Sequence, residues 1–344
     1  MFKVLTLEQA DQWDNIVCSF KEYDIYWLSG YVKAFFIHGD GIPLLIYYED
    51  EKTRGVNVVM KRDVAEDKRF AGIIQEKQYF DFATPYGYGG WLIEGEETEA
   101  LFSKYDFWCR RNCIITEFVR FHPLLKNHKN CEKYYEVVQL GEVVHMDLSS
   151  ATLIADNMIS QNRNKIRKAL KSNIKIYNGR FPEIFKTFRE IYNQTMDKDH
   201  AASYYYFGKE FYKSVLYDLP QNAQIFYAVK DDVIIAASII LMANGKMNYH
   251  LSGSLPDYIK FAPTNLLLYE VALWGNANGY KTLYLGGGVG SEEDGLLVFK
   301  KSFYKGALNR FHIGKRIFDN DKYNELMNLR LDMPDSGFFP KYRA

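Results

Sequence analysis

The stretch that decides the fold is residues 245–306, GKMNYHLSGSLPDYIKFAPTNLLLYEVALWGNANGYKTLYLGGGVGSEEDGLLVFKKSFYKG. Large side chains at 247–251 predict a strand. Apolar residues then recur with helical spacing over 265–278, and an Asn-Gly pair ends that helix. A second predicted strand, 281–285, runs directly into the glycine-rich loop 286–290. In open α/β sheets, ligands bind at the carboxyl ends of strands, so this loop is the first candidate site.

Two adjacent lysines follow the loop. Lys300 and Lys301 lie between Phe299 and Phe303, which are four residues apart and share one face of a predicted helix. The buried aromatic pair would hold the lysines in place. Lys300 is therefore a candidate partner for an oxyanion or a phosphate. A solvated lysine pair on an amphipathic helix is the alternative interpretation.

Six segments, in this order, resemble the FemABX family. They are RFHPL at 120–124, NRNKIRKALKSN at 162–173, YHLSGS at 249–254, APTNLLLYEVALW at 262–274, GYKTLYLGGGVG at 279–290 and DGLLVFKKSF at 294–303. The resemblance extends over about residues 47–306. It implies a peptidoglycan bridge-forming aminoacyltransferase, built from two acetyltransferase-like (GNAT) domains and using aminoacyl-tRNA as donor.

The length of 344 residues favours two domains over one. We expect an α/β protein with two GNAT-like (acyl-CoA N-acyltransferase-type) domains, mixed central sheets and a cleft between them. The first domain would comprise 1–146 and be completed by the tail 310–344, and the second would comprise 147–309. Both halves show the order helix, helix, hairpin, strand, loop, helix, strand. In the second half, the two leading helices are predicted at 153–172 and 184–198.

Composition narrows the classes of partner. Forty-three basic and 43 acidic residues balance, so no global charge draws the chain to nucleic acid or to a membrane. No apolar run reaches the ~18 residues of a membrane span, and acidic residues occupy the amino terminus where a signal peptide would be apolar. We expect a cytoplasmic protein whose only membrane contact would be peripheral. Four scattered cysteines predict neither disulfides nor a metal site.

The donor is indicated by a loop that departs from the usual pattern. Enzymes that use acyl-CoA on this scaffold carry [QR]-x-x-G-x-[GA], whose amides hold the pyrophosphate at a helix amino terminus. The corresponding residues 260–265 read KFAPTN, without glycine, and Pro263 has no amide hydrogen. We therefore expect no cofactor and a charged tRNA as donor, with acyl-CoA as the alternative.

Three groups of residues are candidates for substrate binding. The predicted helix 153–172 carries cations without an intervening acid, among them Arg163, Arg167 and Lys171, which could follow the phosphates of a tRNA. A solvated helix face is the alternative. Tyr205 and Tyr206 offer flat faces and hydroxyls, or pack as ordinary core residues. The family often has a basic residue just before this tyrosine pair; here 201–203 reads Ala-Ala-Ser, which argues against a nucleotide-linked muropeptide acceptor.

The glycine loop and the strand before it supply the remaining candidates. Gly287 and Gly288 would bind substrate through the backbone. Tyr249 and His250 should point to opposite sides of their strand, and the resemblance favours Tyr249 as the residue in the cleft. His250 is then expected to be a core histidine.

The sequence predicts direct attack of an amine on an activated acyl ester. No Ser-His-Asp or Cys-His order indicates a covalent nucleophile, and the carboxylates near the loops do not pair as acid and base; they are Asp81, Glu292, Glu293 and Asp294. Lys300 would stabilise the developing charge. Tyr249, which the resemblance favours as the residue in the cleft, is the second catalytic candidate. The expected acceptor is an amine of a cell-wall peptide precursor. An acyl-CoA-dependent N-acyltransferase and a non-catalytic binder remain open.

Overall fold

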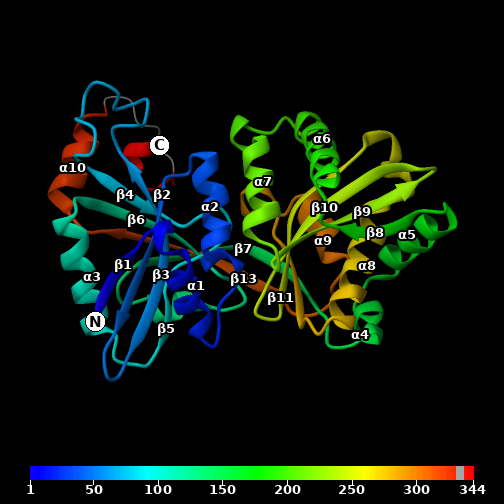
Figure 1. The fold of residues 1–344 in the computed structure, drawn as a ribbon, viewed down its shortest axis with the longest axis horizontal. Helices are drawn as coiled ribbons and strands as arrows, with labels where there is room; N and C mark the ends of the chain where they lie inside the picture. Colours follow the sequence, from blue (N-terminus) through cyan, green and yellow to red (C-terminus); the bar gives the residue numbers. More distant parts are fainter. Residues whose placement is uncertain (331–336) are drawn as a thin grey trace. The chain divides into compact units, whose positions relative to one another are not determined.

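The computed structural model describes residues 1–330 and 337–344, which form two compact units. The first comprises Met1–Leu140 with Phe311–Ala344, and the second comprises Gly141–Arg310. The chain passes from the first unit to the second within β7 (Glu136–Asp147) and returns within β13 (Asn309–Ile317). Figure 1 traces this path by colour.

The first unit is built on a mixed sheet. Its strands lie in the order β1-β2-β3-β4-β6-β13, with β5 paired to β3. Only β4 and β6 run parallel; the other neighbouring strands are antiparallel. Its further elements are β1 (Phe2–Leu5), α1 (Ala10–Ser19), α2 (Ser29–His38), β2 (Ile42–Glu49), β3 (Arg54–Asp63), β4 (Phe80–Ala83), β5 (Leu92–Glu94), α3 (Glu99–Arg111), β6 (Ile114–Phe121) and α10 (Asn320–Asn328), with 3₁₀ turns at Leu7–Gln9, Ile25–Trp27, Asn127–Asn130 and Lys341–Arg343.

The second unit has the same kind of sheet, in the order β8-β9-β10-β11-β12-β7. Here β11 and β12 are the parallel pair. Its elements are α4 (Ala151–Asp156), α5 (Ser160–Lys171), β8 (Lys175–Gly179), α6 (Pro182–Lys198), α7 (Lys209–Asp218), β9 (Ala223–Lys230), β10 (Val233–Ala243), β11 (Lys246–Ser254), α8 (Pro263–Ala277), β12 (Thr282–Gly286) and α9 (Gly295–Lys301), with 3₁₀ turns at Ser203–Tyr205, Pro256–Phe261 and Val289–Ser291.

The two units share a series of eight elements. The series β8, α6, α7, β9, β10, β11, α8, β12 has the order and the pairings of β1, α1, α2, β2, β3, β4, α3, β6. In each unit, a crossover helix (α3 or α8) joins the two strands of the parallel pair, as a parallel connection requires. The predicted α/β class with two mixed sheets is confirmed.

The predicted alignment of the repeat was wrong in its helices. The expected long helix at 153–172 is two helices, α4 and α5, which have no counterpart in the first unit. The break lies at residues 157–159, where Ile159 is extended and its amide donates to the carbonyl of Ser302 instead of continuing the helix. The repeat actually begins with β8, a short and largely exposed strand that lacks an alternating apolar pattern.

The second unit's core fixes the helix and the strands that carry its site. Helix α8 buries Leu266, Leu267, Leu268, Val271 and Ala272 in a cluster with side chains of β10, β11 and β12.

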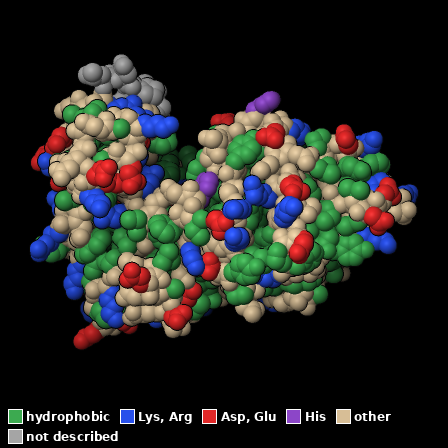
Figure 2. All heavy atoms as spheres, turned by 45° about the horizontal axis from the view of Figure 1, so that its top comes forward, with side chains coloured by type: hydrophobic (Ala, Val, Ile, Leu, Met, Phe, Trp, Pro, Cys, Tyr) green, Lys and Arg blue, Asp and Glu red, His purple; other side chains and the backbone are tan. Residues whose placement is uncertain are grey.

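On the face drawn in Figure 2, acidic and basic side chains are mixed, as the equal numbers of the two charges predict.

Candidate active site

The glycine loop after β12 and the start of α9 are joined by one side chain. One carboxylate oxygen of Asp294 caps α9 by accepting from the Leu297 amide at 2.8 Å, and the other accepts from the Val289 amide at 3.0 Å. Burial alone would raise the pKa of Asp294, but these amides lower it below its ordinary value. Asp294 is therefore an ionised structural link.

Lys300 is enclosed by this loop. Its side chain is 8% exposed, and its Nζ donates to the carbonyl oxygen of Gly287 at 2.6 Å. Burial lowers the pKa of Lys300 to about 8, and the Asp294 carboxylate limits the decrease. Among the described residues, the Gly287 carbonyl is its one hydrogen-bond acceptor. A buried ammonium with N–H groups to spare is suited to stabilise a developing oxyanion.

Three of the loop's glycines make close contacts, and at Gly287 a Cβ would lie 2.8 Å from the carbonyl oxygen of Glu142. Gly286 has a φ of 83°, and a Cβ there would lie 3.3 Å from Nζ of Lys300. A Cβ at Gly288 would lie 2.2 Å from the carbonyl oxygen of Glu292 and 2.5 Å from Oδ1 of Asp294. Glycine thus lets the backbone close around the lysine. The roles of Gly287 and Gly288 in substrate binding remain predictions.

The neighbouring lysine lies in a different environment. Lys301 forms ion pairs with Glu142 at 2.8 Å and Glu293 at 2.7 Å, and these carboxylates raise its pKa. Phe299 and Phe303 meet edge to face with centroids 5.3 Å apart, as their spacing predicts. Two adjacent lysines are thereby separated into a buried one and an ion-paired one.

Tyr249 lies on β11 near a β-bulge. The pairing with β10 shifts by one residue, so that Ile240 pairs with Tyr249 while Ile239 pairs with Leu251, and His250 is left over. Tyr249 packs on the core cluster beneath α8, and its hydroxyl bonds with Ser238 and Ser252. The strict alternation assumed for this strand is therefore wrong, because a bulge interrupts the period of two.

The two half-buried side chains at the bulge have shifted pKa values. Burial raises the pKa of Tyr249, and the serine hydroxyls partly counter this. Burial lowers the pKa of His250 to about 3, so its imidazole is neutral near pH 7. The ladder between β11 and β12 ends just before this point, at Asn248 and Tyr284.

The basic helix is α5. It buries Asn162, Ile166 and Ala169 and leaves most of its cations exposed. Among the described residues, no carboxylate pairs with Arg163, Arg167 or Lys171. Lys301, in contrast, pairs with two carboxylates. Arg163 donates to the Met158 carbonyl, and Arg167 donates to Asn164 at 2.8 Å.

The amino end of α8 lies against this helix. The buried amide of Asn265 donates to Asn162 Oδ1 at 2.8 Å. Ala262, the residue before the helix, is left-handed (φ 57°), and Pro263 occupies the first turn. The end of the helix where a pyrophosphate would bind therefore lacks one amide donor and any glycine.

The tyrosine cluster lies on the 3₁₀ turn Ser203–Tyr205 and just after it. Tyr205 is exposed and meets Tyr204 edge to face, while the Tyr206 hydroxyl donates to Asp197 at 2.7 Å, a bond that raises its pKa. Phe207 is buried and stacks on Phe211 of α7. The apolar residues after it, among them Phe211, Val215 and Leu216, form the buried face of α7. This helix was not among the elements predicted from the sequence.

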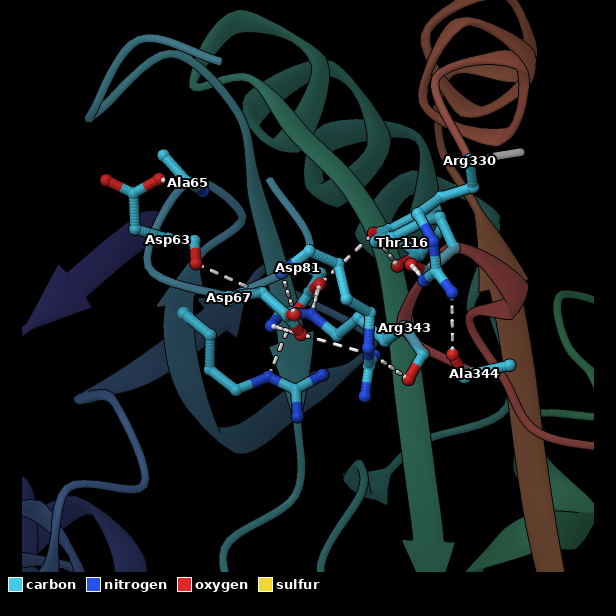
Figure 3. Close-up of polar contacts among 11 residues, drawn as sticks. Asp63, Ala65, Asp67, Asp81, Thr116, Arg330, Arg343 and Ala344 are labelled. Carbon is cyan, nitrogen blue, oxygen red and sulfur yellow. Dashed lines mark hydrogen bonds and ion pairs between the residues drawn. The ribbon is translucent and has the colours of Figure 1, made fainter. Parts of the chain in front are cut away.

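Asp81, a carboxylate expected near the loops, is fully buried in a structural network of the first unit. It accepts from Arg62 at 2.7 Å, from Arg343 at 2.5 Å and from the Tyr342 hydroxyl at 3.1 Å. Figure 3 shows Asp81 with Arg343, and Arg330 with the last residue of the chain, Ala344. Asp81 anchors the tail and is not available as an acid or a base.

Sequence reasoning missed Glu142 and the dual role of Asp294. Glu142 lies on β7, far from Lys301 in the chain, and no local pattern marks it as a partner. The sequence D-G-L-L before the predicted helix was a cap signal for Asp294.

Within the described residues, no cluster of three or more His, Cys, Asp or Glu gathers as metal ligands, and no helix is long and apolar enough to cross a membrane.

A model of the acetyltransferase (GNAT) domain family matches residues 158–301. The structure of FemX superposes with a TM-score of 0.68 at 13% identity, covering 94% of this chain and 99% of that one. The fold is that of tandem GNAT domains. The resemblance to the FemABX family is thereby confirmed for the fold, and the GNAT match supports an acyltransferase.

Two further structures are similar in fold over most of the chain. L-PGS from Bacillus licheniformis gives a TM-score of 0.57 at 14% identity, covering 93% of this chain and 96% of that one. The C-terminal domain of a candidate lysylphosphatidylglycerol synthetase from Agrobacterium fabrum gives 0.56 at 14% identity, with coverages of 90% and 91%. A search of curated protein sequences gave no significant match.

Proposed function

We propose that this protein transfers an amino acid from aminoacyl-tRNA to an amine, with a cell-wall peptide precursor as the acceptor class. The observation that carries the proposal is Lys300: a buried ammonium beside a glycine loop, with one hydrogen bond to Gly287. A purely structural site would not favour this placement, because burial disfavours the charged form of a lysine. This argues against a non-catalytic binder.

The reaction needs no covalent enzyme intermediate. The neutral amine attacks the ester carbonyl, and its electron pair forms the new C–N bond while the carbonyl oxygen becomes an oxyanion. Lys300 donates a hydrogen bond to that oxyanion. The carbonyl then reforms as the ester C–O bond breaks. The amine nitrogen loses a proton, and the ribose oxygen of the tRNA, which leaves as an alkoxide, takes up a proton. The protein's contribution is positioning and charge stabilisation.

The donor is supported by two observations on α5 and α8. The amino end of α8 lacks glycine and one amide at the place where coenzyme A would be held. Helix α5, next to it, presents cations that no described carboxylate neutralises, and these suit the phosphates of a tRNA. The similarity in fold to FemX supports the acceptor class. The acyl-CoA alternative draws its support from the GNAT acetyltransferase match.

The test supplies both donors to the full chain. We expect radiolabelled amino acid to pass from a charged tRNA pool to a lysine-containing cell-wall peptide, while acetyl-CoA with the same acceptor gives no product. Lys300→Met should lower turnover by about a hundredfold or more, the loss typical of one preorganised donor. Lys301→Met, its matched neighbour, should retain most activity. Equal activities of the two variants would remove Lys300 from the mechanism, and transfer from acetyl-CoA alone would reverse the choice of donor.

A further inference from the structure

A polar cavity lies wholly within the first unit. It has a volume of about 430 Å³ and lies between the end of α3, the start of β7 and the end of β13. Its charged lining residues are Asp106, Arg110, Lys133, Glu136, Lys315 and Arg316.

Arg316 forms the inner wall. It is 8% exposed, and its Nη2 pairs with Asp106 Oδ1 at 2.7 Å. Its Nη1 has no hydrogen-bond partner among the described residues. Behind it, the guanidinium lies within 5.0 to 6.0 Å of the ring centroids of five aromatic residues, so its position is fixed by packing. Nη1 is itself buried, and Tyr135 and the Glu117 carboxylate also interact with the guanidinium, so Arg316 contributes a fixed positive charge to the wall.

The other charges leave a positive excess at the mouth. Lys315 pairs with Glu136 at 3.3 Å, so both lining carboxylates are already matched to a cation. Arg110 is exposed and forms no ion pair with any described residue; Asp106, one turn before it, pairs with Arg316 instead. Lys133 pairs at 3.1 Å only with Glu99, and both side chains are largely exposed. Such a surface pair contributes little and can be exchanged for a ligand.

We propose that this cavity binds the phosphate group of a phosphorylated small molecule. Arg110 and Lys133 would contact the phosphate at the mouth, and Arg316 would provide the positive inner wall. The guanidinium fork of Arg110 matches phosphate geometry better than an ammonium group does, whereas the fork of Arg316 already binds Asp106. The ring of Tyr134, stacked on Phe102 at 3.7 Å, offers a flat surface for the organic part of the ligand. The site is independent of Lys300.

The experiment titrates the full chain with pyrophosphate, with a nucleoside diphosphate and with citrate, by calorimetry at low salt. We expect saturable binding of both phosphates, tighter for the nucleoside diphosphate because of the aromatic wall, and weaker binding of citrate. Arg110→Glu should weaken phosphate binding by about tenfold or more, the loss expected for one charge-assisted contact. Lys133→Glu should act in the same direction.

Arg111→Glu is the matched control. Arg111 is exposed, lies next to Arg110 on α3 and does not line the cavity, so it changes the net charge equally. If Arg110→Glu and Arg111→Glu weaken binding to the same extent, the anions sense only the surface charge and the proposal is wrong. Absence of saturable phosphate binding to the parent protein would also overturn it. Tighter binding of citrate than of either phosphate would contradict the ligand class.

Discussion

The corresponding strands β6 and β12 lead into two different side-chain environments. In the first unit, β6 is followed directly by His122, a fully buried residue whose Nε2 lies 3.0 Å from Asp24 Oδ2 and whose Nδ1 accepts from the Leu125 amide at 3.2 Å. In the second unit, the corresponding strand β12 ends in the glycine loop around Lys300. Both ring nitrogens of His122 have polar partners. The ammonium of Lys300, in contrast, makes one hydrogen bond among the described residues. Duplicated topology therefore provides two similar positions, which differ in how far their side chains are already paired.

Removing Asp24 should give the largest effect on stability. Asp24→Ala leaves the buried His122 ring without its partner, and we expect the free energy of unfolding to decrease by about 3 kcal/mol or more. Urea denaturation measures it, with the isosteric Asp24→Asn as the milder control. Loss of activity at unchanged stability would instead give the first unit's strand end a catalytic role.

Lys300→Met should increase stability near pH 7. Folding lowers the pKa of Lys300 from about 10.5 to about 8, so the folded state holds this proton less tightly than the unfolded state. The cost is fully present below pH 8 and disappears as the pH rises from 8 to 10.5. It amounts to at most about 3 kcal/mol, from which the lost bond to Gly287 is subtracted.

The check is denaturation of the parent and the variant at pH 7 and pH 10. The stability difference should shrink at the higher pH. Lys301→Met, which loses two partly exposed ion pairs, should destabilise by no more than about 1 kcal/mol. A Lys300→Met protein less stable than the parent at pH 7 would mean that the lysine is held for structure.

The pH dependence of turnover sharpens the same contrast. Because oxyanion stabilisation needs protonated Lys300, turnover should decline above about pH 8. In Lys300→Arg, whose guanidinium stays charged, the residual turnover should lack this decline. Initial rates between pH 6 and pH 10 measure it. The same alkaline decline in the arginine variant would assign the titration to another group.

The smallest effect concerns α5. Replacing Arg163, Arg167 and Lys171 together by serine should leave folding intact, since these side chains lie outside the buried face of the helix. The slope of log affinity for tRNA against log salt should become shallower by roughly two to three. Filter binding at several salt concentrations measures it. An unchanged slope would make the cations a solvated helix face.

Local patterns predicted most of the fold, and long-range pairing accounts for the errors. The glycine loop, the α8 stripe and the Phe299–Phe303 contact follow from residue spacing. The break between α4 and α5 depends on a bond from Ile159 to Ser302, which no window of sequence contains. In the same way, the bulge at His250 depends on the register with β10.

The candidate site was predictable in position and not in chemistry. The order of glycine loop and lysine pair placed Lys300, but its lowered pKa depends on burial by the folded loop. The neutralisation of Lys301 by Glu142 depends on β7 lying beside β12. Asp81 was misplaced because its partners Arg62, Tyr342 and Arg343 come from both ends of the first unit.

The division of the first unit into two chain segments has a consequence for its synthesis. β13 completes its sheet beside β6, and Arg343 reaches Asp81, yet both segments follow the entire second unit in the chain. At about 5–20 residues per second, the ribosome needs on the order of ten to thirty seconds to pass through the intervening unit. During that interval the edge of β6 lacks its partner, while the second unit can already fold. The β6 edge of the nascent first unit is thus exposed to mispairing until β13 has been synthesised.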